Sequence, residues 1–446
     1  MLESYGERRA IAELTSIFSC QWPNGLLPQI RFGPLPARHR PYRPDAADWG
    51  VPRSISGDTP MLTSGITQPP AVGMCVWDVY RRLSAEAREH NFDLFLGMAS
   101  GLDRYHYWLL SERDPWGERL VACIHPWETG MDNSPAFAPL VDDTRRFVEQ
   151  DDVPVGSYRF GRADISHVAA DQRPTGRDYR AYFGLVALFR NHKYNGRAIV
   201  EASPFLLQDV MFNTLLSASL AATAGLQSAL AETDVLDAQT RTLLHESAGD
   251  NRRTAGAVAS AIRDKLWHDE AGYFYSYDLR GACMLRTPTV ASFMPVLGGV
   301  ATPGQVDRLV AHLAGPGDFE AAFPIPSTAP NSPLFDPVRY WSGPTWPVTN
   351  WLVWRGLRER GHALAASIRR STLDMIAEGK PYDEVTRAAM SVMEANSAGE
   401  GMKEYTTPST RQYKHAWLWD SAITATAWAY VREKPGRHTL QPTTPG

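Results

Sequence analysis

The sequence predicts an all-α protein whose helices run up and down in a ring, with long loops on one rim. Apolar residues recur at i, i+3 and i+4 spacing through most of the chain, as in amphipathic helices, and few segments alternate as strands do. Short polar joints such as "RERGHA" alternate with long connections rich in Gly, Pro, Trp and Asp. Structureless loops beyond about 15 residues usually carry function or disorder. The rim with the long loops is therefore expected to hold a functional site.

The helical pattern can be followed from one end of the chain to the other. Helices are predicted over residues 6–18, 70–83, 86–112, 178–194, 204–228, 234–266, 288–298, 303–313, 345–360, 362–378 and 414–431. Pro69-Pro70, Ser203-Pro204 and Thr302-Pro303 mark three of the starts, because proline fits the first turn of a helix. The long connections span 20–68, 113–176, 267–288, 315–345 and 380–413.

No low-complexity linker or break in composition divides the chain. Because helical rings grow larger than most folds as one unit, we expect residues 1–431 to form a single domain. Residues 432–446 have no apolar face and are expected to form a flexible tail.

Composition excludes several classes of function. The 446 residues include 45 basic and 49 acidic side chains without a basic stripe, so nucleic acid and anionic membrane are poor candidates for partners. The four cysteines lack metal-ligand spacing, and no metal or organic cofactor is predicted. The amino terminus lacks the apolar run of a signal peptide, so we expect a cytoplasmic protein. A small carbohydrate is the expected ligand, since several of the 14 tryptophans stand beside Gly or Pro, where an indole can stack on a sugar. Packing in the core is the alternative for the tryptophans. The sequence leaves a homo-oligomer open.

The stretch "HPWETGMDNSP" at residues 125–135 reads as a loop, because Gly130 and the flanking prolines interrupt any helical or strand pattern. A loop that combines acids with an indole either caps the following helix or brings a carboxylate to a substrate. Both interpretations are open from this stretch alone.

Several long motifs resemble a known group of enzymes. "HPWETGMDNSP" is similar to the acid-bearing loop, and "YWSGPTWPVTNW" at 340–351 to the aromatic substrate-binding segment, of the inverting glycoside hydrolases of the family 63 and trehalase clan. "QWPNGLLPQI" at 21–30, "TQPP" at 67–70 and "GMKEYTTPST" at 401–410 agree with the same family. The match covers most of residues 8–430, and the bacterial mannosylglycerate and glucosylglycerate hydrolases look most similar. The resemblance implies an (α/α)6 barrel.

The chain departs from this family pattern at its beginning. Members of the family start with an extra helix that carries a Trp-Asp-Ser type motif and lines the sugar subsite, whereas this sequence starts at what looks like their second helix. "HAWLWDSAITATAW" at 415–428 resembles that helix but stands in the place of the last one. Three explanations are open: the last helix does both tasks, the chain is circularly permuted, or an upstream start has been lost.

Inversion at a glycosidic bond needs a protonated carboxyl on the leaving oxygen and a carboxylate that activates water on the opposite face. Asp132 is the candidate acid, since Trp127 and Met131 beside it could exclude water and keep it protonated near neutral pH; the resemblance points to the same residue. Glu404 in "MKEYTTP" is the candidate base, with a surface glutamate paired to Lys403 or Arg411 as the alternative. Glu128 competes with Asp132, but the resemblance places the acid after Gly-Met.

The other candidate residues are expected to bind substrate. Glu128 is assigned to sugar hydroxyls or to orienting a neighbour, and the indoles of Trp341 and Trp346 are expected to stack on a pyranose. The further candidates for substrate binding are Gln21, Trp22, Gln68, Trp127, Tyr179, Trp417, Trp419 and Asp420. Arg180 could meet an acidic aglycone such as glycerate, although an ordinary surface arginine is the simpler interpretation.

The sequence therefore predicts an inverting α-glycoside hydrolase that acts on a small glucoside or mannoside, such as glucosylglycerate, mannosylglycerate or a short α-glucoside. Two alternatives are retained. A sugar isomerase or epimerase on a similar barrel would draw on His125, His192 or His415, which share no motif. A sugar-binding pseudoenzyme would follow from the departure at the first helix.

Overall fold

The structure is a computed structural model that describes residues 4–33, 44–57, 62–150, 168–314, 317–323, 325–378, 380, 382–398, 405–406 and 416–429. The α-helices are α1 (Tyr5–Phe18), α2 (Ala46–Trp49), α3 (Arg53–Ser56), α4 (Val72–Arg82), α5 (Ala85–His90), α6 (Phe92–Glu112), α7 (Ala138–Gln150), α8 (Gly176–Asn191), α9 (Gly196–Ala202), α10 (Val210–Ala231), α11 (Ala238–Leu266), α12 (Pro303–Leu313), α13 (Pro347–Glu359), α14 (Leu364–Ala377), α15 (Tyr382–Ala395) and α16 (Leu418–Trp428). The 3-10 helices are η1 (Pro126–Thr129), η2 (Pro135–Phe137), η4 (Ala170–Gln172) and η5 (Val290–Gly299).

The strands are short and serve to tie loops together. They are β1 (Ile30–Phe32), β2 (Leu62–Thr63), β3 (Leu207–Gln208), β4 (Trp267–His268), β5 (Tyr273–Phe274), β6 (Tyr277–Asp278), β7 (Cys283–Met284), β8 (Ser397–Ala398), β9 (Tyr405–Thr406) and β10 (Ala416–Trp417). All pairs are antiparallel, in the orders β10-β1-β2, β3-β6-β7, β4-β5 and β8-β9. Residues from the two ends of the chain thus meet in the first of these sheets.

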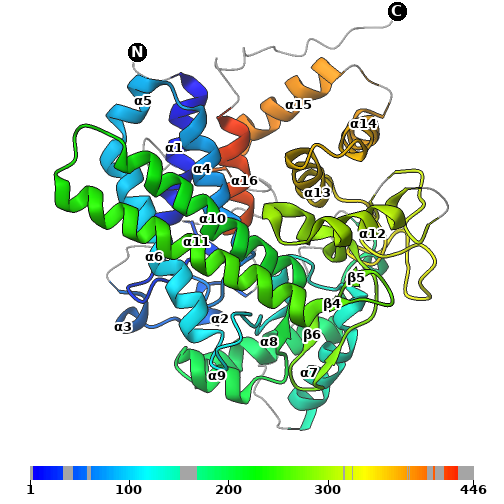
Figure 1. The fold of residues 1–446 in the computed structure, drawn as a ribbon. Coiled ribbons are helices and arrows are strands. Elements are labelled where there is room, and N and C mark those ends of the chain that lie inside the picture. The colour runs from blue at the N-terminus through cyan, green and yellow to red at the C-terminus, as the bar shows by residue number, and fades with distance from the viewer. Residues whose placement is uncertain are drawn as a thin grey trace, which may run out of the picture.

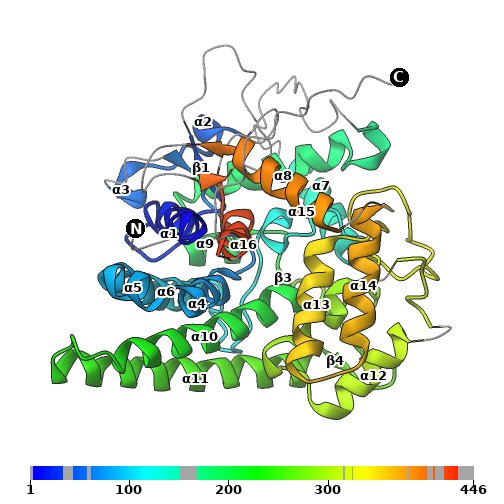
Figure 2. The ribbon, with the colours of Figure 1, turned by 90° about the horizontal axis from the view of Figure 1, so that it is seen from above.

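The long helices form two layers (Figures 1 and 2). In the inner layer α16, α4, α10, η5 and α13 pack side by side in that order. The outer helices cover them: α1 lies on α16, α6 on α4 and α10, α11 on α10, and α14 on α13. This paired arrangement confirms the predicted all-α class and the double-layered barrel.

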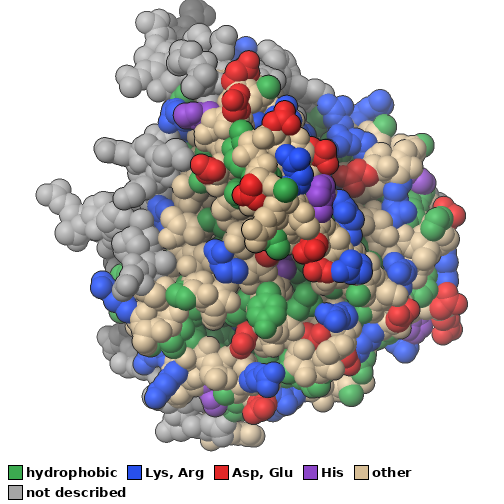
Figure 3. All heavy atoms as spheres, turned by 60° about the vertical axis from the view of Figure 1, so that its left-hand side comes forward, with side chains coloured by type: hydrophobic (Ala, Val, Ile, Leu, Met, Phe, Trp, Pro, Cys, Tyr) green, Lys and Arg blue, Asp and Glu red, His purple; other side chains and the backbone are tan. Residues whose placement is uncertain are grey.

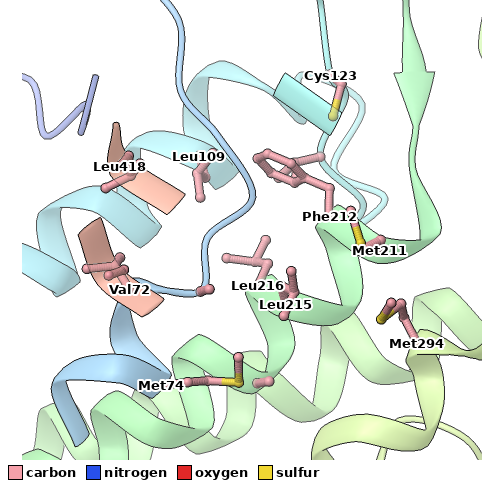
Figure 4. Packing of buried hydrophobic residues seen from close by; sticks show 14 of the residues in the cluster. Val72, Met74, Leu109, Cys123, Met211, Phe212, Leu215, Leu216, Met294 and Leu418 are labelled. Atoms are coloured by element: carbon pink, nitrogen blue, oxygen red, sulfur yellow. The ribbon is translucent and has the colours of Figure 1, made fainter. Parts of the chain in front are cut away.

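In the described part of the chain a large hydrophobic cluster extends from Ala10 to Ala429. Its centre is filled by side chains from α4, α6, α10, η5 and α16, among them Val72, Met74, Leu109, Phe212, Leu215, Met294 and Leu418 (Figure 4). Helix α10 is apolar on all sides because it lies between two layers of neighbours. By length and composition it could span a membrane, but 78% of the apolar stretch is buried in this core.

Most predicted helices are confirmed, and the differences have local causes. The predicted start at Ser203-Pro204 is wrong: residues 207–208 pair as β3, and Asp209 caps α10 by accepting a hydrogen bond from the Phe212 amide at 2.8 Å. Thr302 caps α12 as predicted, in a capping box with Gln305.

Other boundaries also differ from the prediction. Residues 86–112 form two helices that meet at Asn91, and 290–299 form a 3-10 helix with Pro295 inside it. Helices α7 and α15 fall within segments predicted as loops.

The face that contains the outer helices α5, α6 and α11 carries acidic and basic side chains that are interspersed (Figure 3). Neither sign of charge dominates this face, in agreement with the balanced composition.

Candidate active site

The loop at 125–135 is held by hydrogen bonds within the loop and to helix α8. His125 begins η1: its Nδ1 accepts from the Trp127 amide at 3.1 Å, and its Nε2 donates to the Tyr182 carbonyl at 3.1 Å. Burial lowers the pKa of His125 to about 3, so the ring is neutral and both nitrogens are engaged. Gly130 ends η1 at a φ of 74°, in the left-handed region that favours glycine. The turn that follows presents Asp132.

Asp132 lies at the meeting point of three parts of the chain. The Tyr182 hydroxyl on α8 donates to the Asp132 carbonyl at 2.9 Å, and the neighbouring Asn133 Oδ1 accepts from the Trp341 amide at 3.2 Å. The cap of the next helix, η2, is Ser134 rather than Asp132. The helix-cap interpretation of Asp132 is therefore wrong, and the half-buried carboxyl faces other groups.

Asp420, at the start of α16, is electrostatically coupled to Asp132. Burial raises the pKa of Asp420 to about 6, and the negative charge of Asp132 adds to this shift. The Asp420 side chain is half-buried. The structure thus joins two carboxyl groups that are 288 residues apart in the sequence.

Glu128 is engaged by protein groups on both carboxylate oxygens. Oε1 accepts from Arg113 at 3.1 Å and from the Thr67 amide at 3.3 Å; Oε2 accepts from Arg113 at 3.2 Å and from the Ile124 amide at 2.8 Å. Burial raises the pKa of Glu128, while Arg113 and the two amides favour its charged form. Of the roles expected for Glu128, this geometry supports orienting its neighbours, because it staples the loop to the residues before α4.

Glu128→Gln is expected to lower the free energy of unfolding by about 3–5 kcal/mol, since Arg113 would remain buried without its counter-charge. Urea denaturation measures this loss. The double variant Arg113→Met/Glu128→Leu should lose less than either single change, because it buries no unpaired charge. Asp269→Asn, which removes the exposed pair with Arg308, is the control and should cost under about 1 kcal/mol. A Glu128→Gln variant as stable as this control would contradict the structural role.

An aromatic wall stands beside the Asp132 loop. Trp341 and Trp346 stack with ring centroids 4.7 Å apart, and Tyr340 meets Trp346 edge to face at 5.4 Å. The Trp346 indole donates to the Tyr340 carbonyl at 3.0 Å. Trp341 is only 6% exposed, whereas Trp346 is half-buried. Trp346 therefore offers more ring surface to a ligand than Trp341 does.

Two further aromatic candidates lie on the other side of Asp132. Trp127 meets the ring of Tyr182 edge to face at 5.6 Å, and Tyr179 lies one turn earlier on α8, with its centroid 5.9 Å from that of Tyr182. Asp178, next to Tyr179, is buried and paired with Arg145. Arg180 is exposed, in agreement with its interpretation as a surface residue.

Gln68 connects α16 to this group. Its Oε1 accepts from the Trp419 amide at 3.0 Å, and its carbonyl accepts from Tyr105 at 3.3 Å. Within the part of the chain that the structure describes, the Gln68 amide nitrogen donates to no protein group. Trp417 lies in β10 opposite Ile30, and both Trp417 and Trp419 are half-buried.

Gln21 and Trp22 lie apart from this assembly. The Gln21 side chain donates to the Gly101 carbonyl at 2.8 Å and accepts from Arg104 at 2.9 Å. Trp22 is 2% exposed, and its indole donates to Thr63 at 3.0 Å. These contacts anchor a loop to α6 and β2, so neither residue is carried into the proposed sugar site.

Some of the predicted residues fall outside the described part of the chain: Glu404 with its alternative partners Lys403 and Arg411, His415, and the tail at 432–446. Conversely, the structure adds Tyr182, Asn133 and Arg113. Tyr182 and Asn133 could have been identified from the sequence, because Tyr182 shares a helix face with Tyr179 and Asn133 follows Asp132. Arg113 could not, since its pairing with Glu128 depends on the fold.

Comparison with known proteins agrees with this geometry. The family described as the mannosylglycerate hydrolase MGH1-like glycoside hydrolase domain matches residues 2–411. The chain belongs to this family. Membership makes it a glycoside hydrolase.

Individual members of the mannosylglycerate hydrolase-like family align along most of the chain. A mannosylglycerate hydrolase of Rubrobacter radiotolerans is 35% identical over 85% of this chain and 81% of its own length. A glucosylglycerate hydrolase of Mycolicibacterium hassiacum is 30% identical over 81% and 78%. The crystal structure of the family 63 mannosylglycerate hydrolase from Thermus thermophilus in complex with Tris and D-glycerate is 28% identical, with a TM-score of 0.68 over 95% of both chains.

Proposed function

We propose that this glycoside hydrolase cleaves an α-linked mannosyl or glucosyl glycerate with inversion of configuration. Asp132 protonates the leaving oxygen, and Glu404 activates the attacking water. The observation that carries the proposal is the placement of Asp132 beside Asp420, between α8 and the aromatic wall. Burial and the negative charge of Asp132 raise the pKa of Asp420 to about 6, so the Asp420 carboxyl retains its proton to higher pH than an ordinary aspartate does.

The groups around Asp132 suit a sugar ring. The Asp420 carboxyl and the amide nitrogen of Gln68 supply hydrogen-bonding groups for hydroxyls, and Trp346 and Trp419 supply flat apolar faces. In this arrangement α16 forms the wall that the family pattern assigns to a first helix, since it packs on α1 and α4.

The presence of a cationic side chain on the aromatic wall favours a substrate whose aglycone is negatively charged. The Arg173 guanidinium lies 3.9 Å from the centroid of the Tyr340 ring, on the aromatic wall. It is a better candidate than the exposed Arg180 for binding a glycerate carboxylate. The names of the relatives point to the same class of substrate.

Proton NMR of the protein incubated with mannosylglycerate, glucosylglycerate and short α-glucosides tests the proposal. The β-anomer of the free sugar should appear first and the α-anomer only as mutarotation proceeds, because water attacks the face opposite the leaving group. Release of the α-anomer first would overturn inversion. Binding of a sugar by the folded protein without turnover would favour a sugar-binding protein, and sugar isomerisation without hydrolysis would favour the isomerase.

A further inference from the structure

One face of α1 carries polar residues one turn apart at Tyr5, Arg9 and Glu13. Arg9 is 4% exposed and Glu13 is fully buried. Charged side chains are rarely buried without a partner, so this face must be matched by another part of the chain. Helix α16 lies beside α1 (Figures 1 and 2), and the Trp428 ring of α16 contacts Tyr5 and Arg9 on this face.

Each of these residues binds a different segment near the end of the chain. The partners follow in the same order along α1 and along the later chain: Tyr5 with Glu394 of α15, Arg9 with Ser397 of β8, and Glu13 with Thr406 of β9. The Thr406 amide donates to Glu13 Oε2 at 2.7 Å. Helix α1 therefore binds three successive segments near the end of the chain, α15, β8 and β9.

Arg9 and Glu13 bind the two strands of one antiparallel pair. Ser397 pairs with Thr406 in the antiparallel ladder of β8 and β9, so Arg9 and Glu13 hold opposite strands at the same level. Both described strands are therefore held on α1.

Glu13 also faces α16. Ser421, which follows Asp420 directly, lies near the Glu13 carboxylate and lowers its pKa, although the two side chains form no hydrogen bond. The indole of Trp428, on the same helix, donates to the Thr406 hydroxyl at 3.3 Å. Glu13 thus holds β9 directly, and Trp428 joins β9 to α16, the helix that carries Asp420.

We propose that Glu13 is a positioning residue, whose carboxylate holds β9 on α1 and, through the Thr406–Trp428 hydrogen bond, holds α16, and so sets Asp420 relative to Asp132. The inference rests on the proposed function for the roles of these carboxyl groups. It does not make Glu13 a group that touches substrate, because the side chain is fully buried.

The test compares Glu13→Ala with Glu13→Gln in the full chain, using the substrate that the wild type hydrolyses. Glu13→Ala should lower kcat by about 100-fold with little change in KM, since displacement by about 1 Å can cost that much. Glu13→Gln keeps an acceptor oxygen for the Thr406 amide and should recover most of the rate. Hydrogen exchange should show faster exchange of Thr406 and the first turn of α16 in Glu13→Ala only.

Asp103→Ala is the matched control. Asp103 on α6 is a half-buried carboxylate that accepts at 2.7 Å from both Gln227 and Asn251, and it is not part of the proposed active site. This variant should lose stability while the folded protein keeps its kcat. A folded Glu13→Ala variant with wild-type kcat would overturn the inference. If the wild type hydrolyses none of the substrates, the proposed function fails. Hydrogen exchange tests the positioning role separately: a Thr406 amide that exchanges equally fast in Glu13→Ala and in the wild type would refute it.

The pH dependence of stability gives a second readout for Glu13. Burial raises the pKa of Glu13 from 4.5 to about 7. In the described part of the chain the Glu13 carboxylate has one charged neighbour, Arg9, and two neutral neighbours, Thr406 and Ser421. The folded state therefore holds the proton more tightly, and the contribution of Glu13 to stability falls as the pH rises from about 4.5 to 7. Glu13→Gln should remove this fall in thermal unfolding experiments, and an unchanged slope would contradict the burial of Glu13.

Discussion

Replacing Asp132 by Asn is expected to lower kcat for the glycerate glycoside by about 100- to 10,000-fold, the range that a positioned acid or base contributes. The introduced amide cannot donate a proton to the leaving oxygen but preserves the size of the side chain. The carbonyl that accepts from Tyr182 belongs to the main chain and is unaffected by the change. KM should therefore change little, and steady-state kinetics at several substrate concentrations would separate the two parameters.

A glycosyl fluoride separates loss of the acid from loss of the site. Fluoride leaves without a proton, so Asp132→Asn should hydrolyse the α-glycosyl fluoride at a rate close to that of the wild type. Asp143→Asn, which changes an exposed aspartate on α7, is the matched control and should behave as the wild type on both substrates. An Asp132→Asn variant that keeps the wild-type rate on the glycoside, or that fails equally on both substrates, would remove Asp132 from the acid role.

The parts of the fold that follow from local signals could be predicted. Thr302-Pro303-Gly304-Gln305 contains its own cap and starts α12 where expected, because the cap and its partner are three residues apart. Ser203-Pro204 carries a similar signal but lies before a strand, since Leu207 and Gln208 pair with β6, far along the chain. A start signal is therefore decisive only where no distant strand competes for the same residues.

The candidate site could be predicted residue by residue only where the motif itself carried the information. Asp132 and Trp341 stand in long motifs, and the structure joins their loops through Asn133. Trp22 stands in a motif as well, yet its indole is buried against Thr63. An indole suits a sugar site and a core equally well, so composition cannot distinguish the two environments.

Long-range pairs account for most of what the sequence leaves open. The coupling of Asp132 to Asp420 depends on α16 packing beside α4 and α1, a contact between the two ends of the chain. The buried pair of Arg113 and Glu128 forms because α6 ends beside η1. In neither pair are the two residues separated by a spacing that predicts contact. Arg113 occupies the Glu128 carboxylate, whereas the coupling of Asp132 and Asp420 leaves both carboxyl groups as candidates for catalysis.

Replacing Glu404 by Gln is expected to lower kcat by about 100- to 10,000-fold on the glycoside and on the glycosyl fluoride alike. Both reactions need a base that removes a proton from the attacking water, whichever group leaves. This result would distinguish Glu404 from Asp132, whose loss the fluoride should relieve. Lys403→Gln is the control, because it tests the alternative in which Glu404 is only a surface partner of Lys403.

Azide provides the decisive experiment for Glu404. Azide is an anion and needs no base, so a Glu404→Ala variant supplied with azide should regain turnover and release a β-glycosyl azide, inverted relative to the α-linked substrate. A product of retained configuration would indicate a covalent intermediate and contradict inversion. If Glu404→Gln keeps the wild-type rate while Asp420→Asn abolishes it, the base must be assigned to Asp420, the carboxyl that the structure places beside Asp132.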